Sequence, residues 1–87
     1  MDDQHRQALE ALQKELKATE ATNEMLKARI ESLDNEIDTA IKSGHDRENL
    51  QGLRGSLEDS VDEFAAHHPT LAAAIRAAVN TLVNSGV

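Results

Sequence analysis

The first half of the chain places an apolar or small uncharged residue at every third or fourth position. A seven-residue interval relates Leu9, Leu16, Asn23, Ile30 and Ile37, and a second set lies between them: Leu12, Thr19, Leu26, Leu33 and Ala40. This spacing is the heptad pattern of a coiled coil, with the first set at a and the second at d. It predicts one continuous helix over residues 1–43, a rod of roughly 60 Å at 1.5 Å per residue.

The only strong turn signal follows this helix. Gly44 can adopt the left-handed conformation that ends a helix, and Asp46 can cap the next one. We therefore expect a turn at residues 44–46. A second helix is expected over residues 47–68, because Leu50, Leu53, Leu57, Val61 and Phe64 recur there at helical spacing.

Pro69 is the only proline in the chain. It lacks an N–H group and clashes with the carbonyl one turn back, and it disfavours helical angles at His68 before it. We expect a hinge at His68 and Pro69 and a third helix over residues 69–87, which starts with Pro69 in its first turn and stops at Gly86.

These elements predict an all-α helical hairpin. Folding the chain back at residues 44–46 brings Leu33 opposite Leu57 and Leu16 opposite Ile75. Asn23, the polar residue in the apolar seam, is expected to fix the register, with either His67 or Asn23 of a second chain as its partner.

The last helix suggests that the hairpin dimerises. From Leu71 to Val83 the only charged residue is Arg76, and a two-helix hairpin cannot cover so apolar a segment. Small domains with thin cores commonly oligomerise, so we expect a homodimer with four helices in cross-section. The expected seam and interface residues are Leu9, Leu12, Leu16, Asn23, Leu26, Ile30, Leu33, Ile37, Leu57, Phe64, Leu71, Ile75, Val79, Leu82 and Val83. The alternative is a parallel coiled-coil dimer through the first helix, which Ile at a, Leu at d and one Asn at a would suit.

Composition narrows the range of functions. The net charge is −7, Phe64 is the only aromatic residue, and basic residues form no stripe. Direct binding of nucleic acid or of an anionic membrane is therefore disfavoured, since both depend on clustered basic side chains. The chain has no cysteine, its acidic N-terminus is unlike a secretory signal, and its longest apolar run is too short to span a bilayer. We expect a cytoplasmic protein.

Candidate chemistry is sparse. His67 and His68 are weak metal candidates, because adjacent histidines point about 100° apart on a helix and a zinc site needs three or four ligands. Carboxylates are spread along solvated helical faces, and no phosphate-binding loop or nucleophile motif occurs. The sequence predicts no enzyme activity, no cofactor and no metal.

The C-terminal segment "FAAHHPTLAAAIRAAVNTLVNSGV" resembles the signature of a family of short bacterial proteins, domain of unknown function 4404. The matching positions are Phe64, His68, Pro69, Thr70, Leu71, Leu82, Asn84, Gly86 and Val87. The acidic stretch "LEDSVDEF" before this segment is also similar to the family. The resemblance implies no activity.

The function expected from the sequence is that of a non-enzymatic interaction protein, a scaffold or adaptor that self-associates and that can dock a helix of another protein. Two alternatives stay open at this point. One is a metal or pH sensor based on the histidines, and the other is a protein-binding accessory of a chromosome-partition machine.

Overall fold

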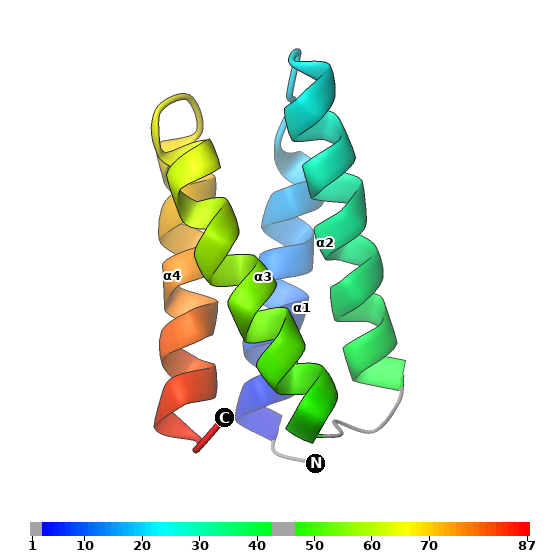
Figure 1. Ribbon diagram of the computed structural model, residues 1–87, viewed down its shortest axis with the longest axis vertical. Coiled ribbons are helices and arrows are strands. Elements are labelled where there is room, and N and C mark those ends of the chain that lie inside the picture. The colour runs from blue at the N-terminus through cyan, green and yellow to red at the C-terminus, as the bar shows by residue number, and fades with distance from the viewer. Residues whose placement is uncertain (1–2, 43–46) are drawn as a thin grey trace.

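The computed structural model describes residues 3–42 and 47–87, which form four antiparallel helices (Figure 1). Their bounds are α1 Asp3–Ala18, α2 Glu24–Lys42, α3 Arg47–Ala65 and α4 Pro69–Asn84. Helix α1 packs against α2 and α4, and α3 also packs against α2 and α4. The described residues therefore build an up-down-up-down bundle, and the all-α class is confirmed.

The continuous helix predicted over residues 1–43 is wrong. Helix α1 ends at Ala18, and residues 19–23 turn the chain back so that α2 runs beside α1 (Figure 1). The cause is local. Asn23 Oδ1 accepts hydrogen bonds from the backbone N–H groups of Met25, at 2.8 Å, and Leu26, at 3.4 Å. Asparagine is among the best residues for capping a helix N-terminus in this way.

The corner at residues 19–23 turns the expected hairpin into a bundle. The hairpin predicted from the sequence requires α2 to pack on α3 and α1 to pack on α4. Both of these helix contacts are present. The corner adds contacts of α1 with α2 and of α3 with α4. The residue-by-residue register of the hairpin stays a prediction, and the turn expected at residues 44–46 lies outside the described residues.

The core lies on the inward stripe of each helix. Each helix contributes leucines that are at most 5 % exposed, and α3 adds Phe64, which is fully buried. The apolar face of α4 is covered within the chain by α1 and α3. Its buried residues are Leu71, Ala72, Ile75, Ala78 and Leu82. Most of the apolar face of α4 is thus buried without the second chain that the sequence suggested, although Val83 stays 46 % exposed.

The second corner lies at the same end of the bundle as the first (Figure 1). Helix α3 ends at Ala65, three residues before the boundary expected at 68, and Pro69 is the first residue of α4. His68 has φ −134° and ψ 66°, which lies outside the helical region, and its carbonyl accepts the first helical hydrogen bond, from Ala72, at 3.0 Å. Proline is well tolerated at such a first position.

Helix α4 ends at Asn84, before the expected boundary at residue 87, and Gly86 lies two residues beyond its last residue. Gly86 has φ +88°, a conformation that glycine adopts without strain. The N–H of Gly86 donates to the carbonyl of Val83 and that of Val87 donates to the carbonyl of Leu82, each at 3.0 Å. This is the Schellman arrangement, which satisfies carbonyls that the helix end leaves free.

Replacing the cap of α2 tests the first corner. We expect Asn23→Ala to lower the free energy of unfolding by about 1 kcal/mol, because two N–H groups at the start of α2 lose their acceptor. Urea denaturation of dilute protein measures this loss. Asn35→Ala is the matched control, because Asn35 is exposed inside α2 and alanine favours a helix. An equal midpoint for Asn23→Ala and the unaltered protein would contradict the capping role.

Candidate functional site

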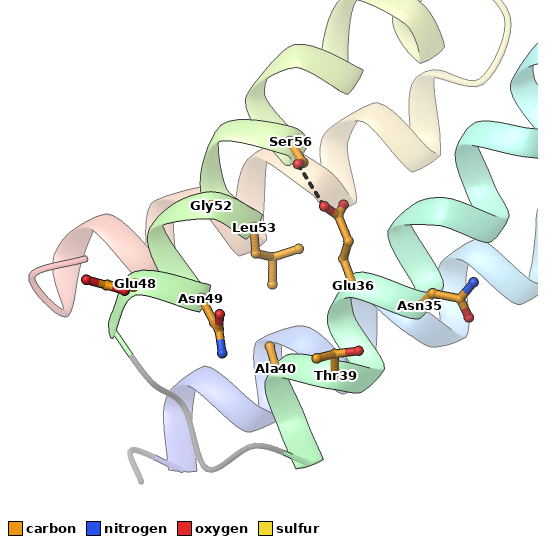
Figure 2. A pocket seen from close by; sticks show the side chains of 9 residues that line it. All are labelled: Asn35, Glu36, Thr39, Ala40, Glu48, Asn49, Gly52, Leu53 and Ser56. Atoms are coloured by element: carbon orange, nitrogen blue, oxygen red, sulfur yellow. Dashed lines mark hydrogen bonds between the residues drawn. The ribbon is translucent and has the colours of Figure 1, made fainter.

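The surface is hollowed between the C-terminal half of α2 and the N-terminal half of α3. This hollow, the α2–α3 groove, has a volume of about 530 Å³. Figure 2 shows its lining residues, which are Asn35, Glu36, Thr39, Ala40, Glu48, Asn49, Gly52, Leu53 and Ser56. Two antiparallel helices joined by a short connection thus leave an open channel along their seam.

The groove has an apolar floor and a polar rim. Ala40 of α2 and Leu53 of α3 are 1 % and 3 % exposed, and the Leu53 side chain points from α3 toward α2 (Figure 2). At one end Ser56 Oγ donates a hydrogen bond to Glu36 Oε1 at 3.1 Å, which joins the two helices. The other rim groups are two amides and a hydroxyl, which both donate and accept hydrogen bonds, and the Glu48 carboxylate, which adds negative charge to that of Glu36.

The groove is open at Gly52 because this residue has no side chain. A Cβ built at Gly52 would meet nothing within 4 Å, and the same is true of Gly55. Neither glycine is required by close packing inside the described part of the chain. Both lie in the interior of α3, where glycine costs about 1 kcal/mol relative to alanine.

A substitution at Gly52 tests this interpretation. We expect Gly52→Ala to raise the free energy of unfolding by about 1 kcal/mol, because the new methyl group meets no atom and alanine favours a helix. Thermal and urea denaturation measure the gain. Gly86→Ala is the matched control and should destabilise the protein, because Gly86 has a positive φ. A loss of stability in Gly52→Ala would show that the groove is closed.

Beyond the groove, a bidentate ion pair joins the same two helices. Arg29 Nε and Nη2 donate to Glu63 Oε2 and Oε1 at 3.0 and 2.8 Å. The hydrogen bonds and charge of Glu63 raise the pKa of Arg29 above its ordinary value. Both side chains are about one-third exposed, so solvent screens the pair and it contributes at most about 1 kcal/mol.

A second ion pair lies within α2. Lys42 Nζ is 2.8 Å from Asp38 Oδ2, and this hydrogen bond lowers the pKa of the Asp38 carboxyl and raises that of Lys42. Because the pKa of Asp38 is lower in the folded state, the ion pair stabilises the fold at pH values above the ordinary pKa of an aspartate. This contribution is lost as the pH falls through the lowered pKa of Asp38.

The two adjacent histidines lie at the corner between α3 and α4. His67 is exposed, whereas His68 is half-buried and its ring meets Phe64 edge-on, with centroids 6.3 Å apart. Among residues 3–42 and 47–87, no three His, Asp or Glu side chains are grouped so that they could hold a metal ion.

The residues expected in the seam separate into three groups by burial. Those that are buried are Leu9, Leu12, Leu16, Leu26, Leu33, Ile37, Leu57, Phe64, Leu71, Ile75 and Leu82. Ile30 and Val79 are half-buried and pack against this core. Asn23 and Val83 are exposed, so the expectation that the Asn23 side chain lies inside a seam is wrong within the chain, because its oxygen caps α2.

Sequence reasoning missed the α2–α3 groove. Gly52 was not among the expected site residues, and the hydrogen-bonding residues Thr39, Asn49 and Ser56 belong to no recognised motif. One signal could have pointed to the groove. This signal is a glycine inside an otherwise helical segment. Such a glycine lowers helix stability relative to alanine, and the local structure does not explain why it is present.

Comparison with known proteins identifies one family. The sequence model of the family described as "Domain of unknown function (DUF4404)" matches residues 6–87. No curated protein and no solved structure matches the chain. Across the part of the chain that the structure describes, no helix combines the length and the apolar character needed to cross a membrane.

Proposed function

The chain belongs to the DUF4404 family, whose description assigns no activity, and we propose that it is a non-enzymatic interaction protein that binds a helix of another protein along the α2–α3 groove. The observation that carries this proposal is the open groove itself. It combines an apolar floor, a glycine, Gly52, that the described packing does not require, and a rim of hydrogen-bonding groups.

The occupant that fits is an amphipathic helix with basic side chains. Helices commonly dock by laying an apolar face into a groove between two helices of the receptor. The floor at Ala40 and Leu53 would receive apolar side chains, and the absence of a side chain at Gly52 lets a backbone approach closely. Glu36 and Glu48 on the rim and the net charge of −7 favour lysine or arginine on the partner.

A synthetic peptide tests the proposal directly. The probe is an amphipathic helical peptide with leucine on one face and lysine on the other, titrated into isotopically labelled protein and followed by NMR. We expect shifts of the amide signals of Thr39, Asn49 and Gly52, which lie along the groove. A peptide with glutamate in place of each lysine is the control and should cause no shifts.

The variant Gly52→Leu fills the groove and should abolish the response to the basic peptide, while its circular dichroism spectrum stays helical because nothing lies within 4 Å of the added Cβ. Equal shifts with the basic and the acidic peptide, or shifts confined to α1 and α4, would contradict the proposal.

We also propose that the protein self-associates. Because the chain covers α4 by itself, a dimer does not have to form by packing two half-open hairpins. A dimer can instead form if the corner at residues 19–23 opens.

A further inference from the structure

The two corners at the same end of the bundle differ at one position. The first residue of α4 is Pro69, which cannot continue a helix, whereas the first residue of α2 is Glu24, which can. Residues 19–23 contain neither proline nor glycine, and the heptad interval from Leu16 to Ile30 runs through them unbroken. One corner is fixed by a proline, whereas no proline prevents the other from becoming helical.

We propose that the corner at residues 19–23 opens and that α1 exchanges between two copies of this chain. In the resulting dimer residues 3–42 form one continuous helix, and α1 of each copy fills the position beside α2 and α4 of the other. The inference rests on the self-association proposed above and specifies its route.

The contacts that hold the corner closed are few. Asn23 caps α2, the Thr19 N–H donates to the Leu16 carbonyl at 3.3 Å, and Ala21 is 8 % exposed. Opening the corner loses the cap but gives residues 19–23 the hydrogen bonds of a continuous helix. The contacts of α1 with α2 and α4 are remade with the second copy, which is why exchange of an identical element is a low-cost route to a dimer.

The packing of α1 on α2 fixes the geometry of the dimer. Gln13 Nε2 donates to Asp34 Oδ1 at 3.3 Å, so these two positions are opposed. The midpoint of this antiparallel pairing lies between residues 23 and 24. In the exchanged dimer, α1 of one copy packs on α2 of the other with this same pairing of positions. The twofold axis that relates the two copies then runs through the midpoint, and Asn23 of each copy lies close to the axis. The Gln13–Asp34 contact then joins two chains.

The matched pair Glu24→Pro and Glu24→Gln tests whether the corner must open. Proline at position 24 repeats the arrangement of Pro69 and leaves the closed bundle intact, because the first N–H of a helix has no intrahelical partner. Proline at position 24 also prevents residues 3–42 from forming one continuous helix. After refolding at high protein concentration, sedimentation should find dimer for the unaltered chain and for Glu24→Gln, and only monomer for Glu24→Pro.

Asn23→Ala should raise the association constant of the dimer about tenfold or more, because each closed chain loses its cap and the open helix gains a better helix former. A Glu24→Pro protein that still dimerises overturns the exchange and leaves self-association standing. An unaltered chain that stays monomeric at every concentration overturns both.

A disulfide between chains tests the predicted contact. The chain has no cysteine, so Gln13→Cys in one preparation and Asp34→Cys in another supply one thiol each. When the two are refolded together and oxidised, exchange predicts a disulfide between them. Glu31→Cys, exposed on α2, replaces Asp34→Cys in the control and should give little product. Because Glu31 lies beside the last turn of α1, Ser32→Cys, exposed among side chains of α2 alone, is the second control. Dimers in which the 13–34 disulfide forms no faster than the 13–32 disulfide overturn the exchange.

Discussion

Phe64→Ala is expected to lower the free energy of unfolding by about 3–5 kcal/mol, the range for removal of a buried aromatic ring. Phe64 is the only aromatic residue and is fully buried at the end of α3, where its ring also meets His68. The cavity would lie beside the corner that joins α3 to α4. Small domains are stable by only about 5–15 kcal/mol, so this one substitution removes a large share of the total.

Urea denaturation followed by circular dichroism measures the effect of Phe64→Ala. Val83→Ala is the control, because Val83 is 46 % exposed and an exposed substitution usually changes stability by less than about 0.5 kcal/mol. If Phe64→Ala costs less than about 1 kcal/mol, the ring does not lie in the core and the packing of α3 on α4 described above is wrong.

Leu33→Ala is expected to cost about 2–5 kcal/mol. Leu33 is fully buried in the middle of α2, which packs on both α1 and α3. Truncation removes apolar area and leaves a cavity that the surrounding helices fill only in part. Urea denaturation should show a lower midpoint. The slope of the free energy of unfolding against urea concentration should change little, since the surface exposed on unfolding is nearly the same.

Met25→Ala on the same helix is the control for Leu33→Ala. Met25 is 69 % exposed, so its truncation should change the free energy of unfolding by less than about 0.5 kcal/mol. Equal losses for Leu33→Ala and Met25→Ala would contradict the assignment of the inward face of α2.

The heptad spacing predicted correctly that most of its leucines and isoleucines are buried. It did not predict the corner, because a helical period describes a face and does not say whether the helix is continuous. At Asn23 two interpretations competed: a polar residue at an a position of a coiled coil, and a cap at the start of a new helix. Tertiary packing decides between them. A closed bundle buries the faces of both α1 and α2 within one chain.

The four helices in cross-section lie within one chain among the described residues, and the homodimer expected from the sequence stays a prediction. The sequence suggested that a second chain covers the wider apolar face of the last helix, whereas the corner at residues 19–23 lets α1 and α3 pack on α4, where Ala72 is buried. The glycine inside α3 could have pointed to the α2–α3 groove, but the shape of the groove could not be predicted, because it depends on the angle between the two helices. The period of apolar residues leaves that angle undetermined.

The central claim is that the chain turns back at residues 19–23, and a distance between α1 and α2 tests it most directly. Gln7 and Thr39 are both exposed, so cysteines at these positions can carry spin labels in one chain, diluted with unlabelled protein at low concentration. The closed bundle predicts a distance within roughly 20 Å, since packed helices lie 8–10 Å apart and the labels add length. A distance of about 48 Å, the rise of 32 helical residues, would mean that α1 and α2 form one continuous helix in the dilute protein and would contradict the closed bundle.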